Sequence, residues 1–497
     1  MARIHPLLYQ VNTRVLLGER GRRLGRAATL DDLPDALVDE VADRGFDWFW
    51  PLGVWRSGPA ARALSRARAD WREGFLHDLP DLREEDVCGS PFAIRAYEVD
   101  PEFGGEAALH RLRGRLARHG VSLLLDFVPN HVSPDHPWVT AHPEWLVEGT
   151  EEDLAREPRN WIRVGRRVVA HGRDPNFPGW PDTVQLNYRH AGLRAAMIDQ
   201  IRRISARCDG VRCDMAMLEL SGVFARTWGD GALPRDGTAP ADAPFWPEAA
   251  AAAREAHPGF VLVAEAYWDL EWELQQQGFD FTYDKRLYDR LRAGDAGPVR
   301  DHLRAEPAFQ DRSVRFLENH DEPRAAATFP PDRHRAAAVV TFLAPGLRFF
   351  HEGQLEGRKV HVSMHLGRRP EEPVDEALRD FYGRLLAVLR RPEVHEGAWR
   401  LRECRPAWEG NPTSGGYVAM SWEGPSGRLL ACANLGPTQG QCWAEAAFPG
   451  LEGGRVVLRD LLGEARLERD GAELAGRGLY LDLPASGHHV FEVGPLP

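Results

Sequence analysis

The stretch "DGVRCDMA", residues 209–216, reads as a buried strand, yet it carries Arg212 and Asp214 two residues apart. Side chains alternate across a strand, so these two charged groups share one face. On an inward face, the permanently charged guanidinium can keep the neighbouring carboxylate ionised and oriented for chemistry. The alternative is a buried salt bridge that only fixes the geometry of the strand.

Seven more short apolar runs have the character of buried strands, and helical patterns or loops follow most of them. Fully apolar strands that alternate with amphipathic helices indicate a parallel sheet covered on both faces, and eight repeats favour a closed (β/α)8 TIM barrel. A doubly wound open sheet is the alternative, but no Gly-rich phosphate loop follows the first strand. The expected strands are 6–11, 47–52, 121–128, 209–215, 260–266, 279–284, 313–319 and 347–353, with helices in 30–45, 105–120, 191–208, 245–259 and 332–346.

Two regions depart from this alternation. Residues 131–190 are rich in Pro, Trp, His and Asp, and an insertion of that length in a compact domain is usually functional or a small subdomain. From about residue 393 the pattern changes to short alternating runs broken by Gly and Pro, which predicts an antiparallel β-sandwich. We therefore expect a barrel formed by 1–130 and 191–392, a subdomain at 131–190 and a C-terminal sandwich at 393–497.

Composition narrows the classes of partner. The chain has 497 residues and a net charge of −12, so we expect a neutral or small substrate and no nucleic acid. No apolar run reaches the ~18 residues of a membrane helix and no secretion signal is evident, so a cytoplasmic location is the default. We expect no metal and no cofactor, because zinc-type ligand spacing is missing, and the oligomeric state stays open. The cysteines are expected to be reduced, mostly buried thiols: Cys88, Cys208, Cys213, Cys404, Cys432 and Cys442.

Acidic residues stand at the carboxyl ends of several expected strands, where the loops of a parallel barrel meet at one mouth. They are Asp126, Asp214, Glu265 and Asp321. Any one of them could be a helix cap, but four together with Arg212 indicate a shared pocket. Three converging carboxyl groups suit glycosidic bond cleavage, in which one attacks the sugar carbon and another protonates the leaving oxygen.

Four ordered segments resemble the signature segments of the α-amylase superfamily of glycoside hydrolases. They are VSLLLDFVPNH (121–131), DGVRCDMA (209–216), VLVAEAYW (261–268) and FLENHDEPR (316–324). PGLRFFHEGQ (345–354) is similar to the family's last-strand segment, and GFDWFWPLG (45–53) to its second-strand segment. The resemblance covers roughly residues 1–392 in the order of the family, and the region that follows is similar to its C-terminal domain.

The resemblance implies a role for each charged group of the expected site. Asp214 would be the nucleophile that forms a β-glycosyl-enzyme intermediate, and Glu265 would be the general acid and then the base. Asp321 would hold sugar hydroxyls and favour the oxocarbenium-like transition state. Arg212 would orient Asp214.

The resemblance also implies a group of substrate-binding residues. His131 and His320 would donate hydrogen bonds to the sugar, and Asp126 is placed with them. Arg324 would bind a hydroxyl or pair with a loop acid. Phe92 stands where members often use a stacking tyrosine, with simple core packing as the alternative.

One departure from the family bears on the substrate. Many glucan-cutting members carry a Lys-His pair after the nucleophile, where this chain has Met217 and Leu218. We therefore expect a retaining glycoside hydrolase that acts on short α-glucosides through a covalent β-glycosyl-aspartate intermediate. A transglycosidase, such as a maltosyl- or glucosyltransferase of the same superfamily, is the nearest rival. A catalytically inert binding module is the alternative of another class.

Overall fold

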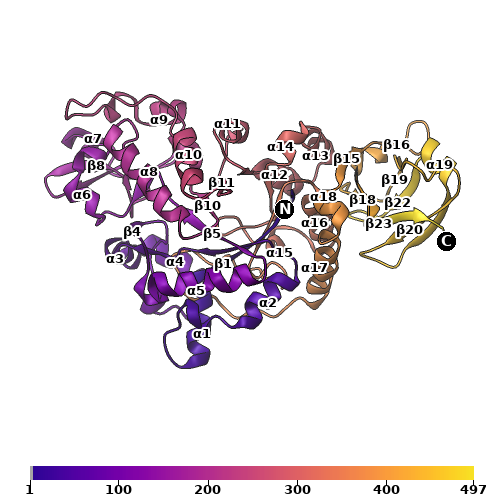
Figure 1. Cartoon of the computed structure of the whole chain (residues 1–497), viewed down its shortest axis with the longest axis horizontal. Coiled ribbons are helices and arrows are strands. Elements are labelled where there is room, and N and C mark those ends of the chain that lie inside the picture. Colours follow the sequence, from indigo (N-terminus) through magenta and orange to yellow (C-terminus); the bar gives the residue numbers. More distant parts are fainter. Residues whose placement is uncertain (1–3, 497) are drawn as a thin grey trace.

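The computed structural model describes residues 4–496 and contains a closed barrel of eight parallel strands at the centre of an elongated molecule (Figure 1). All eight strands lie where the apolar runs predicted them, so the (β/α)8 barrel is confirmed and the open sheet is wrong. In barrel order the strands are β1 (Leu7–Asn12), β14 (Leu347–His351), β13 (Ser313–Arg315), β12 (Phe281–Tyr283), β11 (Val261–Ala264), β10 (Gly210–Cys213), β5 (Ser122–Phe127) and β2 (Trp48–Leu52).

Helices surround the barrel, and each of the five predicted ranges overlaps one. In α8 (Ala191–Ser205), Leu193, Met197, Ile201 and Ile204 recur at helical spacing and are buried, so the helix packs one face on the sheet. The other helices of the barrel region are α1 (Thr13–Leu24), α2 (Asp35–Asp43), α5 (Gly105–Arg118), α9 (Ser221–Trp228), α10 (Trp246–Ala256), α11 (Glu271–Gln276), α12 (Lys285–Ala293), α13 (Ala296–Leu303), α14 (Pro307–Gln310), α15 (Ala325–Thr328), α16 (Pro331–Leu343) and α17 (Glu376–Leu389), and α18 (Pro392–Glu396) leads into the C-terminal sheets.

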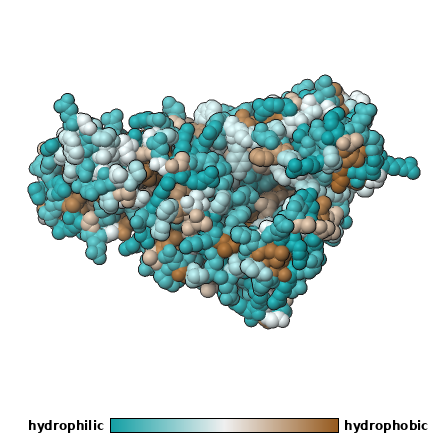
Figure 2. Space-filling view, turned by 180° about the vertical axis from the view of Figure 1, so that it is seen from behind, coloured by the Kyte–Doolittle hydropathy of each residue, from teal (hydrophilic) through white to brown (hydrophobic). Residues whose placement is uncertain are grey.

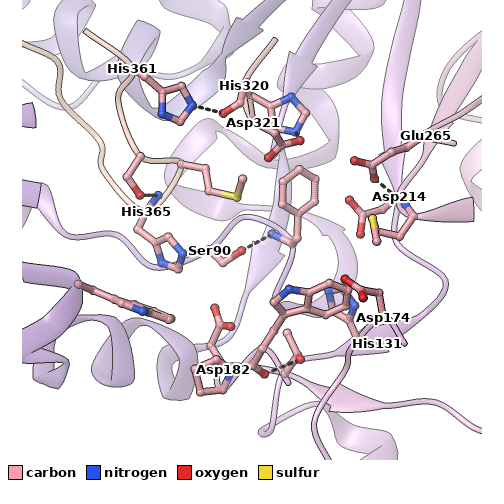
Figure 3. A pocket seen from close by; sticks show the side chains of 18 of the residues that line it. Ser90, His131, Asp174, Asp182, Asp214, Glu265, His320, Asp321, His361 and His365 are labelled. Atoms are coloured by element: carbon pink, nitrogen blue, oxygen red, sulfur yellow. Dashed lines mark hydrogen bonds and ion pairs between the residues drawn. The ribbon is translucent and has the colours of Figure 1, made fainter. Parts of the chain in front are cut away.

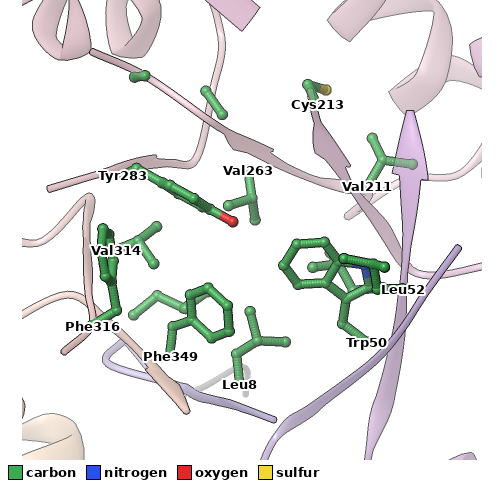
Figure 4. Close-up of a cluster of buried hydrophobic side chains, with 14 of the residues drawn as sticks. Leu8, Trp50, Leu52, Val211, Cys213, Val263, Tyr283, Val314, Phe316 and Phe349 are labelled. Carbon is green, nitrogen blue, oxygen red and sulfur yellow. The ribbon is translucent and has the colours of Figure 1, made fainter. Parts of the chain in front are cut away.

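The barrel interior is filled with large side chains from successive strands (Figure 4). Trp50, Tyr283 and Phe349 are fully buried there, and the rings of Trp50 and Phe349 lie 5.7 Å apart. On the outer face shown in Figure 2, hydrophilic residues dominate and hydrophobic ones form small scattered patches. None of the helices in residues 4–496 combines the length and apolar character needed to cross a membrane.

A first insertion, which we call the excursion, spans residues 53–104 between β2 and α5. It contains β3 (Trp55–Ser57), α3 (Pro59–Ala67), α4 (Ala69–Asp78) and β4 (Ile94–Val99). Phe75 of α4 and Leu79, which directly follows α4, pack with Val87 and Leu366 in a small separate cluster. The excursion therefore packs against the loop that follows β14, far away in the sequence.

A larger insertion lies between β5 and α8. It contains β6 (His131–Val132), α6 (Pro137–Ala141), α7 (Glu151–Arg156), β7 (Trp161–Val164), β8 (Arg167–Ala170) and β9 (Val184–Gln185). The amide nitrogen of Gln185 donates to Asn130 Oδ1 at 2.9 Å and to the Asn130 carbonyl at 3.0 Å. This link ties the end of the insertion to the loop after β5, and the exact limits 131 and 190 stay a prediction.

The C-terminal region forms two antiparallel sheets at one end of the molecule, as the predicted sandwich requires (Figure 1). Trp422 anchors it to the barrel: its ring is buried, and Nε1 donates to the Leu343 carbonyl of α16 at 2.8 Å. The start of this domain at residue 393 stays a prediction. The sheets are β15 (Ala398–Arg402), β17 (Tyr417–Gly424), β18 (Gly427–Asn434), β23 (His488–Pro495), β20 (Arg455–Asp460) and β21 (Arg466–Asp470), and β16 (Cys404–Pro406), β19 (Gly440–Ala444) and β22 (Leu479–Leu483), with α19 (Gly471–Gly476) after β21.

We expect Trp422→Ala to lower the free energy of unfolding by about 3–5 kcal/mol, because a fully buried indole and its hydrogen bond are lost. Differential scanning calorimetry measures the change. Trp408→Ala is the matched control, since the Trp408 side chain lies on the surface of the same domain and is 57% exposed. Equal stability of the two variants would contradict the role of Trp422 as an anchor.

Candidate active site

The three predicted catalytic acids line one pocket at the carboxyl end of the barrel (Figure 3). Asp214 directly follows β10, Glu265 directly follows β11, and Asp321 lies in the loop after β13. The pocket has a volume of about 530 Å³, which is within the usual range for small-molecule sites. Residues that are distant in the sequence are thus brought together as predicted.

Arg212 is the cation that these acids share. Its Nη1 pairs with Asp214 Oδ1, and its Nη2 lies 2.8 Å from Glu265 Oε2 and 3.9 Å from Asp321 Oδ2. The guanidinium is buried, and its central carbon lies 5.4 Å from the Phe92 ring centroid. The pairing therefore reaches beyond its own strand and connects three separate segments.

Two backbone features shape the region around β10. The strands β10 and β11 approach closely at Gly210, and Met215 adopts a left-handed conformation. A Cβ on Gly210 would lie 2.7 Å from the Val261 carbonyl oxygen, so a larger residue would push β10 and β11 apart. Met215 has a φ of 44°, and its N–H donates to Glu265 Oε2 at 2.6 Å. The turn after Asp214 thus contributes a hydrogen bond to the neighbouring acid.

Glu265 has the electrostatic character of a group that can hold a proton near neutral pH. Burial raises its pKa to about 7, and Asp214 and Asp321 add to this effect, while Arg212 opposes it. The hydroxyl of Tyr267 donates to Glu265 Oε1 at 2.8 Å. Glu265 is therefore suited to donate a proton and later to accept one.

Asp321 is shifted in the opposite direction. Burial alone would raise its pKa, but His320, Arg212 and His361 outweigh this and lower the pKa to about 2. His320 Nε2 lies 3.0 Å from Asp321 Oδ2. Asp321 is therefore a permanent anion over the pH range in which Glu265 titrates.

A chain of hydrogen bonds sets the tautomer of His320. The amide nitrogen of Gln10 lies 2.9 Å from His320 Nδ1 and can only donate, so Nδ1 accepts and Nε2 carries the proton that faces Asp321. The other end of the Gln10 amide accepts from His351 Nδ1 at 2.8 Å. Strands β1 and β14 thus orient a side chain of the β13 loop.

Two predicted binding residues line the pocket besides His320. His131 is buried, and burial lowers its pKa, so it is a neutral donor or acceptor of hydrogen bonds. Phe92 also faces the pocket, and its ring centroid lies 5.5 Å from that of His320. Phe92 therefore both lines the pocket and belongs to the hydrophobic core.

The other two predicted binding residues lie outside the pocket lining, which corrects their placement. Asp126 is fully buried beneath it, where its carboxylate accepts hydrogen bonds from Trp50 Nε1 at 3.0 Å and the Gly53 N–H at 2.7 Å. Arg324 pairs with buried Glu318 at 2.7 Å, which matches the alternative of pairing with a loop acid. In both cases a buried partner holds the side chain away from the pocket.

Several lining residues were not predicted. Tyr267 carried a signal, since it follows Glu265 by two positions and so shares its face. Trp71 and His365 carried none, because their wall depends on contact between α4 and the loop after β14. Their rings lie 4.7 Å apart, and Ser65 Oγ lies 3.0 Å from His365 Nδ1. Other lining residues are Ser90, Asp174, Trp180, Pro181, Asp182, Thr183, Met215, His361, Ser363 and Met364.

The two positions at which many glucan-cutting members carry a Lys-His pair do not line the pocket. Met217 and Leu218 are both buried and are not part of the pocket lining.

Within residues 4–496, His, Cys, Asp and Glu side chains form no group of three or more that could hold a metal ion. The oxygen of the Asn130 side chain is already occupied by the Gln185 amide.

Sequence comparisons find similar proteins. Residues 92–287 match the family described as "Alpha amylase, catalytic domain". The chain is 26% identical to α-amylase MalA of Haloarcula japonica over 77% of this chain and 48% of that protein. It is 26% identical to an α-glucosidase of Culex pipiens over 42% of this chain and 33% of the relative.

A third relative is an α-1,4-glucan:maltose-1-phosphate maltosyltransferase of Cereibacter sphaeroides, 33% identical over 27% of this chain and 20% of the relative. The chain thus spans less than half the length of each of these curated relatives.

Solved structures share the fold over the whole chain. The maltogenic α-amylase AmyB from Thermotoga neapolitana superposes with a TM-score of 0.70 at 18% identity and covers 100% of both chains. An α-amylase from Lactobacillus plantarum has a TM-score of 0.67 at 20% identity and covers 98% of this chain and 99% of that chain. In its matching catalytic-domain segment and its eight-stranded barrel, the chain is similar to the α-amylase superfamily of glycoside hydrolases.

Proposed function

We propose that the protein is a retaining glycoside hydrolase that acts on short, neutral α-glucosides. The observation that carries this proposal is the convergence of Asp214, Glu265 and Asp321 on the single guanidinium of Arg212. Two carboxyls on one guanidinium favour the separation of about 5–5.5 Å used by retaining enzymes over the ~6.5–9.5 Å of inverting ones. A cytoplasmic location remains a prediction from the sequence.

The proposed reaction has two steps. Asp214 attacks the anomeric carbon and forms a β-glycosyl ester, while Glu265 transfers its proton to the departing glycosidic oxygen. Water then attacks the same carbon, Glu265 takes a proton from that water, and the bond to Asp214 breaks. The fixed negative charge of Asp321 stabilises the positive charge that develops on the sugar ring in both steps.

The charge of the pocket favours a neutral substrate. Its lining contains five carboxyl groups and no lysine or arginine: Asp174, Asp182, Asp214, Glu265 and Asp321. Such a site repels an anionic group such as a sugar phosphate. The substrate in the name of the maltosyltransferase relative, maltose 1-phosphate, is therefore disfavoured as a donor for this chain.

Transglycosylation is the second candidate, supported by a neighbouring cavity of about 400 Å³. This cavity shares Asp174, Met215 and Tyr267 with the catalytic pocket, and Tyr267 contacts the proposed acid Glu265. An acceptor sugar held there would meet the glycosyl intermediate from the side of the acid, where it competes with water. A binding module without catalysis has no comparable support, because it requires no acid shifted toward neutral pH.

We expect Asp214→Asn to lower kcat on the order of 10⁴-fold or more, because an amide cannot form the glycosyl ester. Glu265→Gln should lower kcat about 10²–10⁴-fold on maltose and much less on α-glucosyl fluoride, whose leaving group needs no proton. Asp301→Asn, on an exposed ion pair, is the control. Turnover of maltose by Asp214→Asn at the wild-type rate would contradict the assignment.

The pH dependence of kcat/KM should reveal the titration of Glu265. Since Glu265 acts protonated and its pKa is about 7, kcat/KM should fall above pH 7 by about tenfold per pH unit. Tyr267→Phe should move this alkaline limb to higher pH, because the lost hydroxyl stabilised the charged carboxylate. Tyr480→Phe, on the C-terminal domain, is the control. An unmoved limb in Tyr267→Phe would argue against Glu265 as the titrating group.

Product analysis should separate the candidate donors and acceptors. Incubated with maltose, the protein should release glucose, and added acceptor sugars should yield new oligosaccharides in proportion to transfer. Incubated with maltose 1-phosphate and a glucan, it should release no phosphate above background, because the lining is anionic. Chromatography and a phosphate assay give both results. Phosphate release coupled to glucan elongation would overturn the neutral-substrate proposal.

A further inference from the structure

The segment after β14 forms one side of the catalytic pocket. Residues 358–369, which we call the strap, contain no helix or strand. Four residues of the strap line the pocket: His361, Ser363, Met364 and His365. Figure 3 shows His361 and His365 on the side of the pocket away from Glu265. A segment without regular structure keeps its position only through contacts with its neighbours.

The strap passes through a narrow slot between α1 and the excursion. A Cβ on Gly18 of α1 would lie 2.8 Å from the Gly367 carbonyl oxygen, and a Cβ on Gly367 would lie 2.7 Å from Cys88 Sγ. The Gly367 N–H donates to the Asp86 carbonyl at 2.8 Å, and the Cys88 N–H donates to the His365 carbonyl at 2.8 Å. The strap is thus closely fitted where it leaves the pocket wall.

Arg368 fixes the strap to the excursion. Its Nε lies 2.9 Å from Asp86 Oδ1 and its Nη2 lies 2.7 Å from Asp86 Oδ2, so the pairing is bidentate. Its Nη1 lies 2.9 Å from both carboxylate oxygens of Asp81. Burial alone would raise the pKa of Asp86, but the Arg368 guanidinium and the Arg83 N–H outweigh this and lower the pKa. The strap thus keeps this carboxylate in its charged form.

Arg369 fixes the strap to the barrel. Its Nε and Nη2 lie 2.6 Å and 3.0 Å from the two carboxylate oxygens of Glu19 in α1. Its Nη1 lies 2.8 Å from Oε2 of buried Glu352, which directly follows β14. The side chains of Arg368 and Arg369 are 16% and 10% exposed. Two consecutive guanidinium groups, which we call the arginine clamp, therefore meet four carboxylates from three separate segments.

Ion pairs of this kind fix geometry more than they add stability. Taking charges out of water costs free energy that offsets much of their attraction, whereas a bidentate guanidinium tolerates only a narrow range of orientations. Neither arginine lines the pocket, but Arg368 follows the lining residue His365 by three positions. The clamp is therefore placed to set the orientation of the wall without contacting substrate.

The strap also contacts the loop after β13, which carries Asp321. His361 Nε2 lies 2.8 Å from the His320 carbonyl oxygen, and the Val360 carbonyl accepts from Arg324 Nε at 3.2 Å. A displaced strap would withdraw four lining side chains and loosen both of these contacts. The other two acids directly follow barrel strands and would keep their positions.

We propose that Arg368 and Arg369 are positioning residues that determine the affinity for substrate, because they clamp the strap to the excursion and to the barrel and so hold the pocket wall in the shape that fits a sugar. This inference rests on the proposed function. Since the clamp lies outside the pocket and none of the three acids belongs to the strap, it acts on substrate binding more than on the chemical step.

Trypsin digestion tests the clamp without any substrate. Arg358 and Lys359 stand at the start of the strap, and trypsin cleaves after arginine and lysine where the backbone opens locally. Arg368→Gln should speed cleavage after these two residues about tenfold or more, because the pairs that oppose opening are lost. Mass spectrometry identifies the cut. Arg111→Gln, which removes a bidentate pair with Asp31 outside the pocket, is the matched control. An unchanged rate of cleavage in Arg368→Gln overturns the inference.

Kinetics on maltose tests the consequence for the pocket. Arg368→Gln and Arg369→Gln should each raise KM about tenfold, as expected for one or two lost hydrogen bonds to substrate, with kcat within about threefold of wild type. Arg368→Lys should give an intermediate KM, since an ammonium group pairs with a carboxylate as a point charge and not in bidentate geometry. A clamp that only stabilises the fold would lower Tm and leave KM unchanged, which contradicts the inference.

The double variant Asp86→Asn/Arg368→Gln keeps the test decisive if Arg368→Gln does not fold, because it leaves no buried charge unpaired. It should show the same faster cleavage and the same rise in KM. No hydrolysis of maltose by wild type defeats the proposed function. Hydrolysis by wild type together with an unchanged KM in the folded clamp variants defeats only the positioning role.

Discussion

The site depends on one buried cation shared by three acids. Arg212 contacts carboxyl groups from three segments, and removing a charge from such a cluster would leave its partners buried and unpaired. One positive charge cannot neutralise three negative ones, so the system favours holding a proton. The proton is expected on Glu265, whose pKa is about 7, and not on Asp321, whose pKa is about 2. Burial and the sharing of one cation thus give the two carboxyl groups different pKa values. Glu265 can carry a proton near neutral pH, whereas Asp321 stays negatively charged.

Much of the fold could be predicted because parallel barrel strands are buried on both faces and read as short apolar runs. The acids could be predicted because each directly follows such a run or lies shortly after it. The sequence pattern placed Asp126 with the substrate, but it could not show that Trp50 and Gly53 hold its carboxylate beneath the pocket. That outcome depends on contacts between strands that are far apart along the chain.

The walls of the pocket were harder to predict than its catalytic centre. The contact of Trp71 with His365 joins an excursion after the second barrel strand to a loop after the last one, and neither segment has a periodic signal. The acids thus directly follow barrel strands or lie shortly after them, whereas much of the pocket wall comes from irregular segments.

The hydrogen bonds from His351 through Gln10 to His320 link the first and last barrel strands to the loop after β13. Strands β1 and β14 pair side by side only when the two ends of the barrel sheet meet. During synthesis on the ribosome, a growing chain that lacks β14 therefore cannot orient His320 in this way. The aligned site would form late, when β1 and β14 pair, and incomplete chains would carry the acids without their alignment.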